Sequence, residues 1–513
     1  MNGTEFLLGP EALARHGERV ALVCGAESVT YAELARQSAL AAAAYASLGV
    51  KPGDKVLLLM RDTPQFAAAW LGLVRMGAVA VALNNKVSEA EYRHVLADSE
   101  ARLALVEDVF VEARRDLSAE LAAQGRLVVA GDQASSSDAR APRWQTLLAS
   151  ARPGSALDVA PEWPAFYLYS SGTTGRAKGI VHSHHAVTCV GAALRLLGVR
   201  AGEKVFATSR FFFAYGLEHG LLGPLAMGAT SIVCPDWPDE HAVLEAMAAH
   251  APRYFFSVPT VYRRLLAQPT DRLAALRAVA ACVAAGEHVP AQLVAQWKAA
   301  TGLELLSLYG MSETFCACLV TPPGTSDGRR TGKPLPGIEL RLLAADGTPV
   351  ETGTPGILWV KHPSQALEYR NLPERTREQF KDGWFCTRDF FVRDAEGHYL
   401  HQGRADELVK IAGQWVLPSE LEAAAASAPE VVEAACVPVP DRDGFERLAL
   451  FLIPRGDGEA ALRAAAQACE RALPRHKRPK WLRAVAELPR TPTGKVQRFK
   501  LREQLARELE AAK

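Results

Sequence analysis

The chain has 513 residues, and at about 150 residues per domain this length predicts between about two and four compact units. It carries 58 Lys and Arg against 57 Asp and Glu, so its net charge of +1 excludes recruitment to a nucleic acid or an anionic membrane by overall charge. The hydrophobic fraction of 49% and the charged fraction of 22% are typical of a folded globular protein. These values exclude a single small binding module and a disordered chain, and they favour a large enzyme.

The nine cysteines are scattered along the chain without a CxxC pair, which predicts reduced thiols in a cytoplasmic protein. The N-terminal stretch MNGTEFLLGP lacks a basic region followed by an apolar core, so we expect no signal peptide. The most apolar stretch, residues 66–83, is interrupted by Arg75 and Gly77, whereas a membrane-spanning helix needs about 18 uninterrupted apolar residues or more. We therefore expect a soluble, cytoplasmic protein with no membrane or nucleic-acid partner.

Apolar runs typical of buried strands alternate with Ala-rich helical patterns over most of the chain. A strand-like run at 55–60 is followed by a helical pattern at 64–76 and a second run at 78–83, and similar runs stand at 103–106, 228–234 and 278–284. This alternation predicts βαβ units and mostly parallel sheets. Ligands bind such sheets at the carboxyl ends of the strands, where Gly-rich and polar clusters therefore indicate sites.

Two segments indicate breaks between units. Residues 134–155 carry Ser, Pro and Gly at both ends and are typical of a surface excursion. A strand-rich region ends at 403–406, and the stretch from there to residue 513 contains two strand-like and two helical runs, enough for a separate domain. We expect a large N-terminal domain of α/β subdomains over 1–405 and a small, mobile C-terminal α+β domain over 406–513.

Residues 169–179 (YSSGTTGRAKG) come after a strand-like run and indicate phosphate binding. Glycines allow the backbone to approach a ligand, while hydroxyls, backbone N–H groups and the charge of Lys178 bind phosphate oxygens. The spacing differs from GxxxxGK[ST], which disfavours a Walker-type NTPase. We expect a helix to continue from this loop, and a flexible surface loop remains the alternative. The candidate phosphate-binding residues are Ser170, Ser171, Gly172, Thr173, Thr174, Gly175 and Lys178.

This segment closely resembles the phosphate-binding loop of the adenylate-forming superfamily, which includes acyl-CoA synthetases, firefly luciferase-type enzymes and peptide-synthetase adenylation domains. Ala177 stands where that family usually has Pro. The resemblance extends over nearly the whole chain, from TYAEL at 30–34 to a motif near residue 500. It implies an AMP-forming ligase that uses ATP, Mg²⁺ and coenzyme A.

Residues 309–314 (YGMSET) come after the strand-like run 303–308 and place a carboxylate beside a hydroxyl. Such a pair suits a hard divalent cation that bridges phosphates. The resemblance implies that Glu313 binds the metal and that Ser312 contacts the α-phosphate. It also implies an adenine site made by Ala285, Gly286, Glu287, Tyr309 and Gly310.

Further motifs extend the resemblance toward the C-terminus. Asp389 occupies the place of the family's ribose-binding acid, and Arg388 replaces the usual Gly. A carboxylate suits this role because it accepts hydrogen bonds from two hydroxyls. The segment 403–413 resembles the family's hinge, which implies that Arg404 contacts the ribose and Asp406 is the pivot. The turn at 489–498 (PRTPTGKVQR) matches the catalytic-lysine motif and implies that Lys495 neutralises charge during adenylation.

Coenzyme A binding is assigned to the same part of the chain. The resemblance places Gly413, Gln414 and Trp415 near the pantetheine path. Lys477 belongs to a basic cluster at 475–478 that suits the phosphates of coenzyme A, and a solvated basic face is the equal alternative.

Residues 211–220 (FFFAYGLEHG), with a Leu-rich helical run continuing to Met227, resemble the acid pocket of benzoate-CoA ligases, as does VQRFKLR at 496–502. A ring-walled pocket suits a flat aromatic acid. We expect Phe212 to be core, and Glu218 and His219 to contact an amino or hydroxyl substituent. The candidate pocket residues are Phe213, Ala214, Tyr215, Gly216, His219 and Met311.

The resemblance thus implies an aryl-CoA ligase for benzoate or an amino- or hydroxybenzoate. Three alternatives stay open: a stand-alone adenylation enzyme that loads a carrier protein, a short- or medium-chain fatty acyl-CoA ligase, and a noncatalytic nucleotide-binding protein. The ring substituents and the formation of a homodimer are left open as well.

Overall fold

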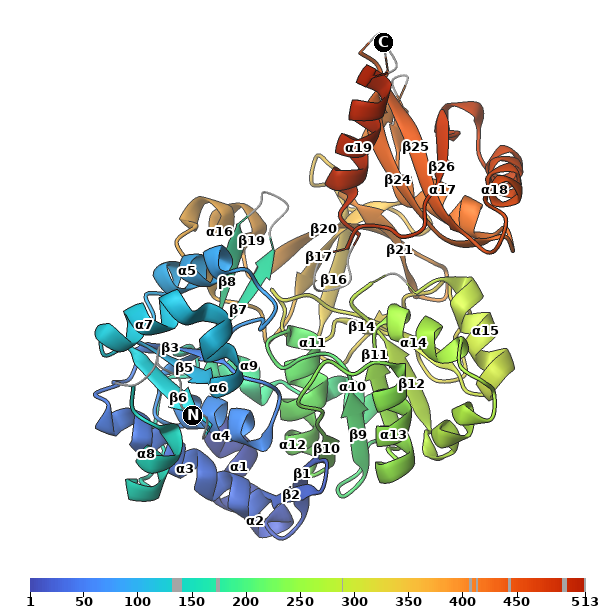
Figure 1. Ribbon diagram of the computed structural model, residues 1–513. Coiled ribbons are helices and arrows are strands. Elements are labelled where there is room, and N and C mark those ends of the chain that lie inside the picture. The colour runs from blue at the N-terminus through green and yellow to red at the C-terminus, as the bar shows by residue number, and fades with distance from the viewer. Residues whose placement is uncertain are drawn as a thin grey trace. The chain divides into compact units, whose positions relative to one another are not determined.

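A computed structural model describes residues 1–131, 141–171, 176–287, 289–405, 408–411, 414–441, 444–490 and 496–511. They form two compact units (Figure 1). Unit 1 comprises Met1–Val289, Leu293–Glu339 and Val360–Phe385, and unit 2 comprises Pro290–Gln292, Leu340–Trp359 and Cys386–Lys513. The boundary expected between residues 405 and 406 concerns a mobile hinge and stays a prediction.

The first sheet of unit 1 has seven strands in the order β18-β8-β7-β4-β3-β5-β6. Pairs among β4, β3, β5 and β6 are parallel, as is β4 with β7, whereas β8 runs antiparallel to both β7 and β18. The strands are β3 Lys55–Leu59, β4 Val79–Ala82, β5 Leu103–Glu107, β6 Leu127–Ala130, β7 Pro164–Ser171, β8 Ala177–Ser183 and β18 Glu368–Tyr369.

Helices cover both faces of this sheet, which explains its continuous apolar strands. Val56 and Leu58 pack in one core with α3 (Tyr31–Ser47) and α4 (Pro64–Arg75). The intervening Leu57 packs in another core with α5 (Glu89–Asp98) and α7 (Arg115–Ala123). Figure 1 shows these two helix pairs on opposite sides of β3 and β5.

The second sheet of unit 1 has nine strands in the order β15-β14-β13-β12-β11-β9-β10-β1-β2. The run from β13 to β1 is parallel, and the end strands are antiparallel. The strands are β1 Val20–Cys24, β2 Glu27–Thr30, β9 Lys204–Ala207, β10 Thr230–Ile232, β11 Tyr254–Ser257, β12 Ala281–Ala284, β13 Leu305–Tyr309, β14 Leu319–Val320 and β15 Lys333–Pro334. The mostly parallel α/β architecture is therefore confirmed.

One face of the second sheet is covered by helices α13 (Glu240–His250), α14 (Pro259–Leu266) and α15 (Ala291–Thr301), which share a core with its strands. The helical segment made of α11 (Ala214–Leu217), the π-helical turn η3 (Glu218–Leu222) and α12 (Gly223–Met227) packs on both sheets of unit 1. Its leucines join the core of the first sheet, and Tyr215 joins a core of the second. The helical run expected up to Met227 is confirmed.

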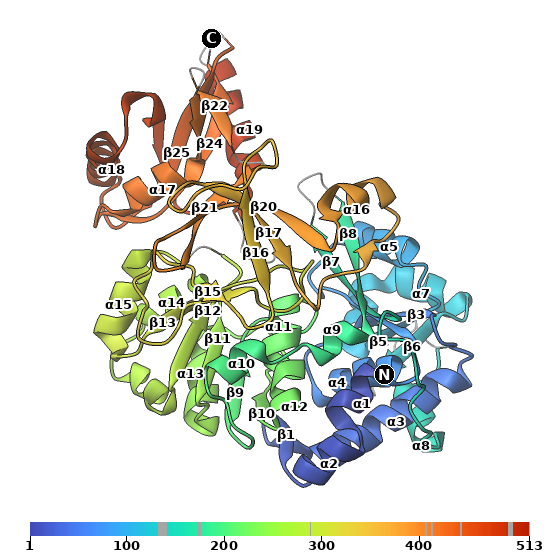
Figure 2. The same ribbon diagram turned by 180° about the vertical axis from the view of Figure 1, so that it is seen from behind.

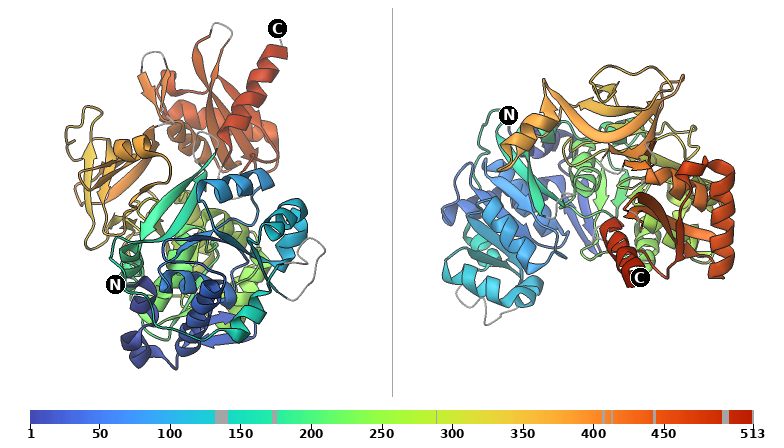
Figure 3. Two further views of the ribbon diagram at one scale, coloured as in Figure 1. Left: turned by 90° about the vertical axis from the view of Figure 1, so that its left-hand side faces the viewer. Right: turned by 90° about the horizontal axis from the view of Figure 1, so that it is seen from above.

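Unit 2 contains most of β16 (Glu339–Leu343), β17 (Gly356–Lys361) and β20 (Trp384–Arg393), and all of β21 (Tyr399–Arg404), which pairs with β20. It also contains a three-stranded sheet in the order β24-β25-β26. Helices α17 and α18 share a core with one face of this sheet, and α19 packs on the other (Figures 2 and 3). Their bounds are α17 Pro418–Ala426, β24 Val431–Pro440, β25 Glu446–Pro454, α18 Gly458–Ala472, β26 Trp481–Ala484 and α19 Arg498–Ala511.

The prediction of a helix after the phosphate loop is wrong. Residues Ala177–Ser183 form β8, which pairs with β7 so that Ser170 stands opposite Lys178. Pairing on both edges, with β7 and with β18, satisfies the hydrogen bonds of the β8 backbone and outweighs the local helix preference.

Among the described residues, no helix combines the length and apolar character needed to cross a membrane.

Candidate active site

Lys178, Glu313 and Tyr369 meet in unit 1. Lys178 Nζ lies 2.7 Å from Glu313 Oε1, and the Tyr369 hydroxyl donates to the same oxygen at 2.8 Å. The Lys178 ammonium also lies 4.1 Å from the centroid of the Tyr369 ring. Burial raises the pKa of Glu313, but the charge of Lys178 and the hydrogen bonds from Lys178 and Tyr369 outweigh it and lower the pKa. Glu313 is therefore an ionised carboxylate at neutral pH.

Strand register explains why Lys178 meets Tyr369. Tyr369 on β18 stands opposite Ile180 on β8. Lys178 and Ile180 are two residues apart, so their side chains project from the same face of the sheet. Lys178 is thus the diagonal neighbour of Tyr369, within reach of a long side chain. Glu313 comes from the turn after β13, on the other sheet of unit 1.

His182 fixes the turn that carries Ser312 and Glu313. Its Nε2 donates to the backbone carbonyl of Ser312 at 2.8 Å, and its ring stacks on Phe166 with centroids 4.8 Å apart. The side chain is fully buried, and burial lowers its pKa to about 4, so the ring is neutral. Sequence reasoning missed the roles of His182 and Tyr369, because no local motif reveals contacts across the two sheets.

The residues assigned to adenine stand at one edge of the second sheet. Ala285, Gly286 and Glu287 come directly after β12, and Tyr309 ends the neighbouring parallel strand β13. The carboxyl ends of parallel strands form the usual ligand edge of an α/β sheet. Gly286 has a φ of +87°, a conformation that glycine adopts without strain. At Gly310 a Cβ would approach the Ala317 Cα to 3.2 Å.

The segment predicted to bind the acid forms the start of the helix between the sheets. Tyr215 is only partly buried, and its hydroxyl donates to the carbonyls of Val283 at 3.2 Å and Ser257 at 3.4 Å. Gly216 has no room for a side chain, because a Cβ would lie 2.1 Å from the Arg210 carbonyl oxygen. These contacts fix the Tyr215 ring in one place. Phe213 and Met311 are also partly buried, and Ala214 is 9% exposed.

A buried ion pair supports the phenylalanines that precede this helix. Arg210 Nε lies 3.1 Å from Asp62 Oδ2, and the same carboxylate accepts the Phe211 N–H at 3.1 Å. Burial raises the pKa of Asp62 to about 7, although the charge of Arg210 opposes the shift. Phe212 is 4% exposed and packs edge-on against Phe213, so its expected place in the core is confirmed. The sequence pattern does not reveal the Asp62 contact.

In unit 2 the residues assigned to the ribose are neighbours. Asp389 on β20 stands opposite Arg404 on β21, with Asp389 Oδ1 3.5 Å from Arg404 Nη1. His401 Nε2 lies 3.9 Å from the same oxygen. Arg388, at the usual glycine position, has a φ of +60°. The glycine preference at this position is thus a preference for left-handed backbone, which Arg388 adopts at some cost.

The residues assigned to coenzyme A are described only in part. Gln414 is exposed on β23 (Gln414–Val416), and Lys477 forms an ion pair with Glu420 on α17. Trp415 and Ser171 are described by their backbones in β23 and β7. The predicted residues outside the described ranges are Gly172, Thr173, Thr174, Gly175, Asp406, Gly413 and Lys495.

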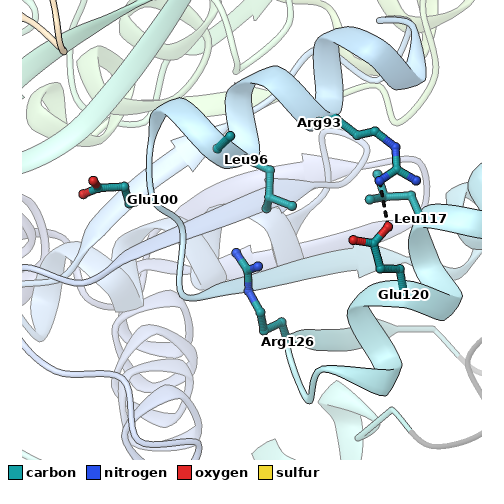
Figure 4. Close-up of a pocket in the computed structure, with 7 residues that line it drawn as sticks. Arg93, Leu96, Glu100, Leu117, Glu120 and Arg126 are labelled. Carbon is teal, nitrogen blue, oxygen red and sulfur yellow. Dashed lines mark hydrogen bonds and ion pairs between the residues drawn. The ribbon is translucent and has the colours of Figure 1, made fainter.

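A surface depression of about 380 Å³ lies apart from these residues (Figure 4). It is bordered by α5 and α7, and Arg93 pairs with Glu120 across it at 2.7 Å. The depression is lined by Arg93, Leu96, Ala97, Glu100, Leu117, Glu120 and Arg126. None of these lining residues is among the candidate site residues, so the depression is separate from the candidate active site.

Comparison with known families shows which family the chain belongs to. The model of the AMP-binding enzyme family matches residues 10–370, and that of the AMP-binding enzyme C-terminal domain matches residues 420–495. The chain belongs to the AMP-binding enzyme family. The family model covers both sheets of unit 1 and the described candidate residues up to Tyr369.

Relatives and solved structures align over nearly the full length. The 3-hydroxybenzoate–CoA ligase of Aromatoleum sp. (strain CIB) is 40% identical, with 98% of this chain and 97% of the relative covered. The 3-hydroxybenzoate–CoA/4-hydroxybenzoate–CoA ligase of Thauera aromatica is 38% identical at the same coverage. The structure of a benzoate CoA ligase from Burkholderia xenovorans LB400 is 31% identical with a TM-score of 0.88, covering 98% of this chain and 100% of that one.

Proposed function

We propose that this chain joins an aromatic carboxylic acid, benzoate or a hydroxy- or aminobenzoate, to coenzyme A in an ATP-dependent, AMP-forming reaction. The observation that carries the proposal is that unit 1 presents both an ionised Glu313 carboxylate beside Lys178 and the partly buried aromatic rings of Phe213 and Tyr215. The first suits a nucleotide phosphate with its cation, and the second suits a flat ring. The hydroxybenzoate–CoA and benzoate–CoA ligases among the relatives support the same substrate class.

In the first half-reaction a carboxylate oxygen of the acid attacks the α-phosphorus of ATP. A new P–O bond forms, the bond to pyrophosphate breaks, and acyl-AMP results. Lys178 is proposed to hold the phosphates, Ser312 the α-phosphate and Lys495 the developing negative charge. The buried, ionised oxygens of Glu313 fit Mg²⁺, which prefers carboxylate ligands and, when bound, neutralises phosphate charge.

In the second half-reaction the thiolate of coenzyme A attacks the acyl carbonyl. The C–S bond forms, the C–O bond to AMP breaks, and AMP leaves. Lys495 is proposed to serve the first step only. The C-terminal domain over 406–513 is then proposed to turn about Asp406, so that Lys495 leaves the site and is replaced by Gly413, Gln414, Trp415 and Lys477. Asp389 and Arg404, which already pair, are proposed to hold the ribose in both steps.

The test is pyrophosphate release with purified protein, ATP and Mg²⁺ over a panel of acids. The panel contains benzoate, hydroxybenzoates, aminobenzoates and fatty acids of different length, each with coenzyme A or with a phosphopantetheinyl carrier protein as acceptor. The proposal requires release with benzoates and formation of the CoA thioester. Activity confined to fatty acids, or thioester formed only on the carrier protein, would replace it.

We also propose a cytoplasmic location. All nine cysteines are free thiols, five of them buried, as suits a reducing compartment. Light scattering at working concentrations decides between a monomer and a homodimer.

A further inference from the structure

His219 is a buried, neutral histidine beside the proposed acid pocket. It lies in the π-helical turn η3 and is 1% exposed. Its ring centroid lies 5.0 Å from that of Tyr215 and 4.9 Å from that of Phe256. Burial among these rings disfavours the charged form and lowers the pKa of His219 to about 4. The imidazole is therefore uncharged at neutral pH.

The hydrogen bond of His219 identifies its tautomer. Nδ1 lies 3.2 Å from the backbone carbonyl oxygen of Tyr215, which can only accept, and 3.4 Å from Glu218 Oε2, so we assign the ring hydrogen to Nδ1. A neutral imidazole has one N–H, and Nε2 consequently presents a lone pair. Among the residues that the structure describes, this nitrogen has no hydrogen-bond partner. Buried acceptors are nearly always paired, so His219 Nε2 marks a place for a donor.

The local helix holds His219 in place. Residues Glu218–Leu222 form a π-helical turn, a rare geometry that is frequent at functional sites. Glu218 anchors this turn, because its Oε2 accepts the Ala317 N–H at 3.1 Å. Gly220 lets the turn approach the aromatic segment, since a Cβ there would lie 3.0 Å from Phe211 Cε1. The turn that carries His219 is thus anchored by Glu218 and packed closely against Phe211.

We propose that His219 Nε2 accepts a hydrogen bond from a hydroxyl or amino group on the ring of the bound acid. The inference rests on the proposed function, which places the ring against the partly buried side chains of Phe213 and Tyr215. The His219 ring centroid lies 5.0 Å from that of Tyr215, so a substrate ring that packs on Tyr215 would lie next to this histidine. Hydroxyl and amino groups share the required chemistry, because both donate a hydrogen, whereas a fluoro group does not. His219 is then a specificity-determining residue.

The test compares kcat/KM for hydroxybenzoates and for benzoates that carry fluorine at the same ring position. His219→Phe keeps a flat ring and removes the acceptor, while His219→Gln retains an amide oxygen near the position of Nε2. His184→Asn is the matched control, since His184 is another fully buried histidine whose Nε2 lacks a partner among the described residues. Thermal melting shows that each variant is folded.

At one or more ring positions we expect the wild type to prefer the hydroxyl over the fluoro acid. His219→Phe should lower that ratio by about tenfold to a hundredfold, as loss of a substrate hydrogen bond does. His219→Gln should recover part of it, and His184→Asn should leave it unchanged. An equal loss of kcat/KM with hydroxy-, amino- and fluorobenzoates, or an unchanged ratio, would overturn this inference and leave the proposed function standing. A wild type inactive with every benzoate would overturn the proposed function as well.

Discussion

Tyr369 donates its phenolic hydrogen to Oε1 of Glu313 over 2.8 Å. The two residues lie 56 positions apart in the sequence and on different sheets of unit 1. Tyr369 also contacts Gln379, so its hydroxyl is held on both sides. The proposed metal-binding carboxylate is therefore positioned by a neutral hydroxyl as well as by the Lys178 ammonium.

Tyr369→Phe should weaken the use of MgATP while leaving the fold intact. The ring that packs against Lys178 remains, but Glu313 loses one hydrogen bond, and a bond to a charged group contributes about 1.5–3 kcal/mol. We expect kcat/KM for MgATP to fall about tenfold or more, measured by pyrophosphate exchange, at an unchanged KM for the acid. Tyr254→Phe is the control, because it removes a hydroxyl that donates to the remote Glu203 at 3.2 Å. A similar decrease in both variants would count against positioning by Tyr369.

Lys178→Met should destabilise the protein more than Lys178→Met combined with Glu313→Gln. The single substitution leaves a buried carboxylate without its cation, and breaking such a pair costs about 3–5 kcal/mol. Neutralising Glu313 removes most of that cost, so the double variant should regain stability while remaining inactive. Denaturant unfolding of the four proteins in the cycle measures the coupling free energy. Additive effects would show that the 2.7 Å contact contributes no net stability.

Acidification below about pH 6.5 should remove the stabilising contribution of four buried histidines, His182, His184, His219 and His362, because burial lowers the pKa of each. Each pKa is lowered to about 4, from 6.5. The unfolded chain therefore binds protons first, and stability present above pH 6.5 is lost as the pH falls toward 4, by up to about 1.4 kcal/mol per pH unit and histidine.

His184→Asn tests this pH dependence. Asn retains an acceptor for the Gly3 N–H, which donates to His184 Nδ1 at 3.0 Å. The variant should lose less stability between pH 7 and pH 5 than the wild type, measured by thermal melting. His185→Asn, at an exposed neighbouring position, should follow the wild-type curve. A His184→Asn curve that also follows the wild type would contradict the assignment.

Lys495→Ala should separate the two half-reactions. The proposed division of labour gives this lysine a role in adenylation only, so pyrophosphate release should be abolished. Formation of the CoA thioester from supplied acyl-AMP should remain close to the wild-type rate. Single-turnover measurements of each step decide the matter, and equal loss of both steps would mean that Lys495 serves throughout.

The sequence by itself determined the layers of this protein and the segments that carry its chemistry. Runs such as 55–60 and 78–83 are apolar without interruption, because both faces of their sheet are covered by helices. The motifs around Lys178 and Glu313 are local, so their residue types and spacing predicted phosphate and cation binding, whereas the ribose role of Asp389 was implied only by the family resemblance. The continuation of the phosphate loop was not predictable, because pairing of β8 on both edges decides it.

Only the tertiary structure decided which of these residues meet. Lys178 and Glu313 are separated by 135 positions, and their contact depends on how one sheet of unit 1 packs against the other. Tyr369 reaches them through the register of β18 on β8, in which a shift of one residue would turn its side chain to the opposite face. Among the described residues, His219 Nε2 likewise has no hydrogen-bond partner, because the ring is buried among aromatic rings of separate elements. No periodicity in the sequence encodes that burial.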